Sequence, residues 1–170
     1  MSEPRNDLAR KLWVTLAAGV AAAVVEMMVV LPIQMKLGAS PGVVFKSIAA
    51  GALGRNAFAG GAATVGLGVF FHTLISLVAA GLYVFATDRL PVLLRRPVSM
   101  GLLYGVACYV VMTFGVIPLS RLTFALPKTL LLFSLSFGTH LVAFGLPIAV
   151  VARLLLSAPP ASVPATSTAH

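Results

Sequence analysis

Near its N-terminus the chain carries an apolar run, LWVTLAAGVAAAVVEMMVVLPI, which extends from Leu12 to Ile33 with Glu26 as its one charged residue. At 1.5 Å of rise per residue, about 20 residues are enough to cross about 30 Å of hydrocarbon. Three further runs of similar length follow, and together the four predict helices over residues 12–33, 62–86, 98–118 and 129–155. The sequence therefore predicts an all-α protein, a transmembrane four-helix bundle.

The composition separates this chain from soluble globular proteins. Of its 170 residues, 59% are hydrophobic and 9% are charged, whereas soluble domains carry about a quarter charged residues. The charges fall almost entirely between the apolar runs, which favours an integral membrane protein over a soluble protein with a large core. We expect a single four-span membrane domain over residues 1–156 and a disordered tail, rich in Pro, Ser, Thr and Ala, over residues 157–170.

Basic residues indicate the partner and the orientation. The net charge is +8, but Lys and Arg stand singly or in pairs at the ends of the runs, so we expect the lipid bilayer and no nucleic acid as partner. The larger set lies on one side, close to the span ends: Arg5, Arg10, Lys11, Arg89, Arg95, Arg96 and Arg153. The positive-inside rule therefore predicts cytoplasmic N- and C-termini. Trp13, Tyr83 and Tyr104 then fall near the inner interface, as in an aromatic belt.

The connection between the first two runs contains a predicted helix of its own. Ser40-Pro41 is a helix start signal, because a cap residue precedes a proline at the first helical position. The residues that follow place Val44 and Ile48 on one apolar face. We expect a short helix that lies in the membrane interface and ends near Gly54. A re-entrant hairpin is the alternative.

Small residues line one face of each predicted span, as at helix contacts within membranes. In the second span they recur every four residues: Gly60, Thr64, Gly68, His72, Ser76 and Ala80. The glycines expected to let helices approach closely are Gly60, Gly68, Gly101 and Gly105. Four such faces on one axis predict a compact bundle, although Gly101 and Gly105 would serve equally well in a homo-oligomer or against another membrane protein.

Three side chains within the spans are able to carry charge near neutral pH: Glu26, His72 and His140. Because an ionisable group in a bilayer core is costly, each is a functional-site hypothesis by default. From the rise per residue, Glu26 lies ~10 Å, His72 ~15 Å and His140 ~16 Å below the outer ends of their helices. Tyr109 and Met112 of the third span reach the same layer. The sequence therefore predicts that the carboxyl and the two imidazoles meet in one polar centre.

This polar centre has several interpretations. It could fix the register of the helices, with Glu26 protonated or hydrogen-bonded to one histidine. It could be a relay for protons, ions or a small solute. His72 and His140 could bind haem b, or together with Glu26 a transition metal, and a lipid or other hydrophobic ligand could lie between the helices. No P-loop, dinucleotide fingerprint, nucleophile elbow or metal-spaced cysteine pair is present, so we assign no catalytic residue and favour a non-enzymatic protein.

Several short segments are also similar to a known group of proteins. They are Gly51–Arg55 (GALGR), Ala57–Thr64 (AFAGGAAT), Phe71–His72 and Arg89–Pro91, followed by Arg96–Pro97, Leu103–Val106 and Gly145–Ala149 before Arg153. On these residues, from about Ser47 to Arg153, the chain resembles small uncharacterised bacterial four-span membrane proteins of unassigned activity. The resemblance implies a bacterial inner membrane and the four-span layout, and it implies no chemistry.

Overall fold

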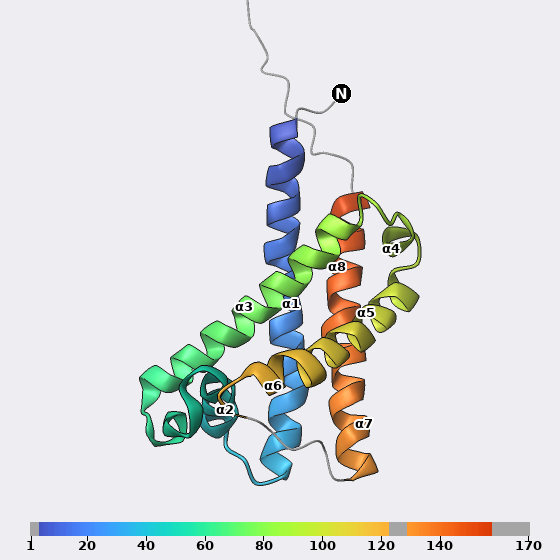
Figure 1. Ribbon diagram of the computed structural model, residues 1–170. Helices are drawn as coiled ribbons and strands as arrows, with labels where there is room; N and C mark the ends of the chain where they lie inside the picture. The colour runs from blue at the N-terminus through green and yellow to red at the C-terminus, as the bar shows by residue number, and fades with distance from the viewer. Residues whose placement is uncertain (1–3, 123–128, 158–170) are drawn as a thin grey trace, which may run out of the picture.

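The computed structural model describes residues 4–122 and 129–157, and this part of the chain is helical without a strand (Figure 1). Its α-helices are α1 (Pro4–Lys36), α2 (Pro41–Leu53), α3 (Ala62–Ala86), α4 (Val92–Arg95), α5 (Pro97–Val111), α6 (Ile117–Leu119), α7 (Leu130–Thr139) and α8 (Leu146–Ser157). A 3-10 helix, η1 (Gly54–Ala59), follows α2, and two π-helical segments, η2 (Met112–Val116) and η3 (His140–Gly145), follow α5 and α7.

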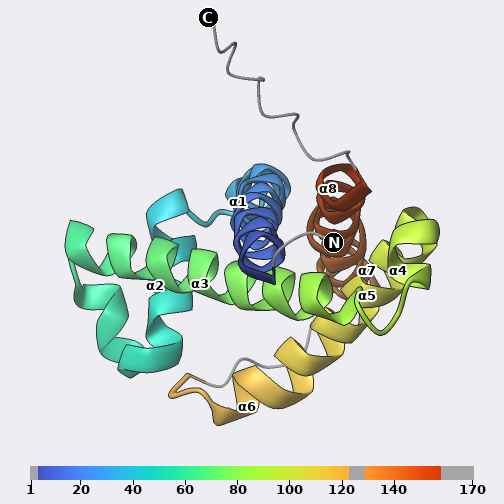
Figure 2. The same cartoon turned by 90° about the horizontal axis from the view of Figure 1, so that it is seen from above.

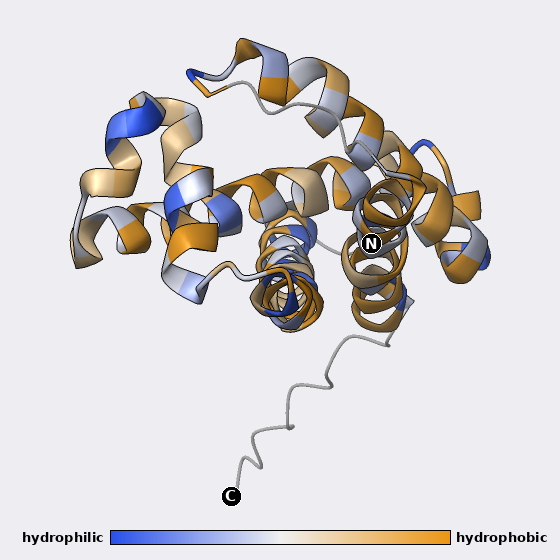
Figure 3. Ribbon diagram, turned by 90° about the horizontal axis from the view of Figure 1, so that it is seen from below, coloured by the Kyte–Doolittle hydropathy of each residue, from blue (hydrophilic) through white to orange (hydrophobic). Residues whose placement is uncertain are grey.

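Four segments are long and apolar enough to cross a membrane: Asn6–Lys36, Ala62–Ala86, Pro97–Leu119 and Leu130–Ser157. The predicted all-α, four-span architecture is therefore confirmed. Many hydrophobic side chains of the long helices are exposed, as expected for helices in contact with lipid. Much of the ribbon of these helices is coloured as hydrophobic (Figure 3). Of the predicted tail, Ser157 ends α8 and the remainder lies outside the described residues.

Two nearly upright rods form the back of the molecule, α1 and the continuous α7–η3–α8 (Figure 1). These rods pack against each other, α3 packs on α1, and α5 packs on η3 and α8. Both α3 and α5 cross these rods obliquely (Figure 1), and they diverge from the turn at α4 (Figure 2). The four spans thus form a bundle that is open between α3 and α5, rather than four faces closed on one axis.

The predicted helix after the first span is confirmed as α2. The Ser40 hydroxyl accepts a hydrogen bond from the Val43 amide at 3.4 Å, and Pro41 occupies the first turn. Gly54 ends the helix with a φ of +69°, a conformation that L side chains rarely adopt. The helix packs against α3, where Gly68 meets the Phe45 carbonyl directly. Its place in the membrane interface stays a prediction.

A second close helix contact joins α5 to η3 and α8. A Cβ atom on Gly105 would lie 2.5 Å from the His140 carbonyl oxygen, and one on Gly145 would lie 2.5 Å from the Gly105 amide nitrogen. Gly101 meets Ala149 and Leu146 in the same way. The Gly101 and Gly105 face is therefore used inside the bundle. Gly60, by contrast, follows η1, and the atoms nearest to a Cβ added there belong to Thr64 and Ala57, which are close to it in the chain.

The three residues predicted to form the aromatic belt differ in exposure, and the place of Trp13 at the interface stays a prediction. Trp13 is 63% exposed, but Tyr83 is 1% exposed. The Tyr83 hydroxyl donates to the Leu93 carbonyl at 3.0 Å, and the Tyr104 hydroxyl donates to the Ala79 carbonyl at 2.7 Å. The two rings meet edge to face with centroids 5.0 Å apart. Both tyrosines therefore make contacts inside the bundle instead of facing the headgroups. They lie at its narrow end, where the space between α3 and α5 is smallest.

Gly105→Ala tests the backbone contact. Its Cβ would displace the η3 backbone, and overpacking of this kind typically destabilises a protein by about 1–3 kcal/mol. We expect thermal unfolding in detergent micelles, followed by circular dichroism, to occur at lower temperature. The control is Gly66→Ala in α3, where a Cβ meets nothing within 4 Å. Equal unfolding temperatures for Gly105→Ala and the wild type would contradict the contact.

Candidate functional site

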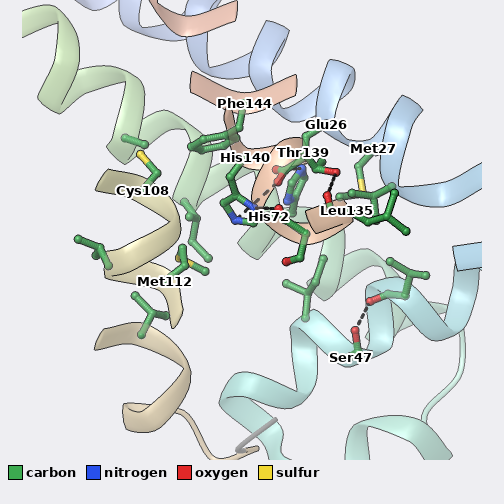
Figure 4. A pocket seen from close by; sticks show the side chains of 18 of the residues that line it. Glu26, Met27, Ser47, His72, Cys108, Met112, Leu135, Thr139, His140 and Phe144 are labelled. Carbon is green, nitrogen blue, oxygen red and sulfur yellow. Dashed lines mark hydrogen bonds and ion pairs between the residues drawn. The ribbon is translucent and has the colours of Figure 1, made fainter. Parts of the chain in front are cut away.

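The structure brings Glu26, His72 and His140 together, as their depths predict (Figure 4). Glu26 projects from α1 and is 7% exposed. Its Oε2 lies 3.8 Å from Nε2 of His72 on α3, and its Oε1 lies 3.9 Å from Nε2 of His140 at the start of η3. Both distances exceed that of a direct hydrogen bond. The carboxyl therefore sits between two imidazoles without being hydrogen-bonded to either.

Backbone carbonyls decide which nitrogen of each imidazole carries the proton. Nε2 of His72 lies 3.1 Å from the Ala23 carbonyl, and Nδ1 of His140 lies 2.9 Å from the Ser136 carbonyl. Because a carbonyl oxygen only accepts, the neutral His72 carries its hydrogen on Nε2 and the neutral His140 on Nδ1. Nε2 of His140, which faces Glu26, is then an unprotonated acceptor.

His140 stands at the first residue of a π-helical segment. The Leu146 amide bonds to the Leu141 carbonyl five residues back, and Pro147, which has no amide hydrogen, follows at once. The other π segment, η2, likewise ends two residues before Pro118. Segments of this kind are rare and often occur at functional sites. The proline in the fourth span was recognisable in the sequence, but the widened turn before it was not.

An aromatic cluster holds the His140 ring from the other side. The rings of Tyr109 and His140 meet edge to face with centroids 5.3 Å apart, and Tyr109 meets Phe133 and Phe137 in the same manner. The sequence places Tyr109 in the layer of the polar centre, and the structure confirms that placement. With its ring packed and Nδ1 bonded, His140 is held in one orientation.

A pocket of about 730 Å³ is lined by residues of α1, α2, α3, α5 and α7, and the polar centre lies in its wall. Most of its wall is apolar, and the exposed side chains of Val78 and Leu82 on α3 and of Val111 on α5 lie at its edges. Met112 and Cys108 also line it (Figure 4). Sequence patterns did not predict this pocket, because it arises from the divergence of α3 and α5.

Toward the N-terminus of α1 the polar centre is covered by packed hydrophobic side chains. This cluster is drawn from α1, α3, η3 and α8: Val14, Ala18, Ala22, Ala80, Tyr83, Val84, Phe144, Ile148, Ala149 and Ala152. Ser76 is also buried in this region, where its hydroxyl donates to the His72 carbonyl at 2.9 Å. The pocket continues past the trio in this direction, because Val78, Leu82 and Tyr104 also line it.

The arrangement also bears on cofactor binding. Within residues 4–122 and 129–157, no group of three or more His, Cys, Asp and Glu side chains could hold a metal ion. Coordination of haem iron or a metal through Nε2 of His72 would require loss of its hydrogen bond to Ala23. The residues present therefore do not fit a bis-histidine or three-ligand site as they stand.

Comparison with protein-family models, with curated proteins and with solved structures finds no match to this chain.

The assigned tautomers are testable by NMR. In ¹⁵N-histidine-labelled protein carrying His170→Ala, we expect an Nε2–H signal for His72 and an Nδ1–H signal for His140, because each donates to a carbonyl. The ¹⁵N shifts are recorded at a pH at which both rings are neutral, and His72→Gln and His140→Gln provide the assignments. The same tautomer in both rings would refute the geometry.

Proposed function

We propose that this protein is a non-enzymatic membrane protein that binds one amphipathic molecule, with an apolar chain and a small polar head, in the pocket between α3 and α5. The observation that carries the proposal is a largely apolar cavity of about 730 Å³ with Glu26, His72 and His140 in its wall. Ligand pockets are typically about 300–1,000 Å³, mostly apolar, with a few polar groups that orient the ligand. Both properties are combined here.

A binding site explains the polar centre better than the other interpretations. A trio that only fixed helix register would be expected to make direct hydrogen bonds, but both Glu26 contacts are near 4 Å. A relay would need polar groups that continue from the trio toward the N-terminus of α1, where most of the packed side chains are hydrophobic. An occupant of the pocket would instead complete the bonding of the carboxyl.

Location and orientation belong to the same proposal. We place the protein in a bacterial inner membrane with both termini in the cytoplasm. Lys11 of α1 pairs with Asp88 after α3 at 2.8 Å, and Arg10 donates to the Leu155 carbonyl of α8 at 2.7 Å. The basic residues near the N-terminus, the second connection and the end of α8 thus gather at one end, which supports the charge argument. Binding to a second copy or to another membrane protein stays a prediction.

Photolabelling tests the pocket. The probe is a dodecanol analogue with a diazirine in its chain, added to the protein in phosphatidylcholine bilayers. We expect saturable labelling of α3 and α7, detected by peptide mass spectrometry. Leu135→Trp should abolish the saturable part, because Leu135 lines the pocket, whereas Leu131→Trp should retain it, because Leu131 is exposed on the same helix. Labelling that never saturates, or that is unchanged in Leu135→Trp, would overturn the proposal.

Cysteine accessibility tests the orientation. In a Cys108→Ala background, Leu37→Cys lies in the first connection and Leu90→Cys in the second, and both leucines are about half exposed. We expect a membrane-impermeant maleimide to label Leu37→Cys, but not Leu90→Cys, in intact spheroplasts, and to label both after lysis. The reverse pattern would place the termini outside.

A further inference from the structure

We infer that the head group recognised in the pocket is a primary ammonium, whose N–H groups donate to the Glu26 carboxylate and to Nε2 of His140. This inference rests on the proposed function and specifies its ligand. The ligand class is a lipophilic amine, with a single apolar chain that lies along the wall between α3 and α5.

The first argument is the unmet bonding capacity of Glu26. A carboxylate has two oxygens and about four acceptor positions. Among the residues that the structure describes, the charged partners nearest to this carboxyl are the two imidazoles at 3.8 and 3.9 Å, and no Lys or Arg pairs with it. A buried carboxylate without a cation or a donor is strongly unfavourable. A cationic donor from a ligand would supply both.

The second argument is the direction of four side-chain hydrogen bonds made by residues that line the pocket. The Thr139, Ser47 and Tyr104 hydroxyls donate to the carbonyls of Leu135, Val44 and Ala79. The Nε2 hydrogen of His72 points to Ala23 in the same way. These four donors are therefore engaged with backbone oxygens, whereas the Glu26 carboxyl and Nε2 of His140 are acceptors that remain for a ligand.

Among simple head groups, the ammonium matches this set best. It brings three donors and one positive charge, so it can bond Glu26 and His140 together, and charge-assisted hydrogen bonds are roughly twice as strong as neutral ones. A hydroxyl brings one donor and no charge. A carboxylate head would repel Glu26 in a medium of low dielectric constant. A phosphate beside the ammonium, as in phosphatidylethanolamine, would bring the same repulsion close.

Binding involves no covalent step, and no proton is gained or lost by the ligand and Glu26 taken together. An ammonium can meet an ionised Glu26, or a neutral amine can take the proton of the Glu26 carboxylic acid. Both routes end in the same ion pair, with His140 accepting a second N–H hydrogen at Nε2. Rigid placement of His140 by Tyr109 and Ser136 keeps that acceptor directed at the carboxyl.

The test compares head groups on one chain length. Dodecylamine, dodecanol and dodecanoate compete with the diazirine dodecanol probe at matched mole fractions in phosphatidylcholine bilayers. We expect dodecylamine to compete at about tenfold lower mole fraction than dodecanol, and dodecanoate to compete least. Equal competition by all three, or preference for dodecanoate, would overturn the ammonium inference while leaving the pocket in place. Absence of saturable probe labelling would overturn the proposed function as well.

Two carboxylate-to-amide variants test whether the preference for dodecylamine over dodecanol depends on Glu26. In Glu26→Gln, the ratio of the mole fractions at which dodecanol and dodecylamine compete should fall to about one, whatever the overall level of probe labelling. The matched control is Asp88→Asn, which removes an exposed carboxylate that pairs with Lys11 outside the pocket, and its preference should equal that of the wild type. A preference that survives Glu26→Gln would refute the role of the carboxylate. If Glu26→Gln fails to fold, the wild-type comparison still decides.

A further arm distinguishes a bilayer lipid from a free amine as the source of the ammonium. Phosphatidylethanolamine is added to the bilayers in place of dodecylamine. Competition below that of dodecylamine supports a free amine, in agreement with repulsion between the phosphate and Glu26. Competition equal to that of dodecylamine would support recognition of the ammonium on a lipid.

Discussion

The contact between α5 and η3 at Gly105 and Gly145 is the constraint on which the remaining architecture depends. Here backbone packs on backbone, with no side chain between, since a Cβ on Gly145 would lie 2.5 Å from the Gly105 amide nitrogen. In a bilayer, where lipid is as apolar as leucine, close approach of this kind is a main source of helix association. Through this contact α5 packs against the α7–η3–α8 rod, whereas α3 packs against α1. The two helices therefore lie apart.

The space between α3 and α5 is lined by different kinds of side chain at its narrow end and at its wide end. At the narrow end, Tyr104 reaches across to the Ala79 carbonyl at 2.7 Å, and Tyr83 packs edge to face on its ring. At the wide end, the gap becomes the pocket, and the ionisable side chains face into it. The same arrangement thus explains why two tyrosines are buried in the bundle and why a carboxyl is left without a donor.

Features set by length and depth could be predicted from the sequence. The four spans follow from apolar runs long enough to cross hydrocarbon, and α2 follows from the Ser40-Pro41 start signal. The meeting of Glu26 with the histidines follows from their common depth, which holds whichever helices are neighbours. The pocket could not be predicted, because small residues mark every span and do not say which faces pair. A Cβ on Gly60, at the start of one such stripe, would lie nearest to Thr64 and Ala57, which are close to it in the chain, whereas Gly145, outside the predicted set, packs directly on α5.

The lateral position of the pocket determines what can enter it. A molecule that arrives between α3 and α5 comes from the hydrocarbon of the leaflet, so its polar end has already lost most of its water before it reaches Glu26. Sugars and multiply charged phosphates, which stay strongly hydrated in every protonation state, are therefore retained at the membrane surface, whereas an amine can enter in its neutral form and take its proton from Glu26. The bilayer therefore excludes strongly hydrated molecules first. The residues that line the pocket need to discriminate only among the molecules that enter the hydrocarbon.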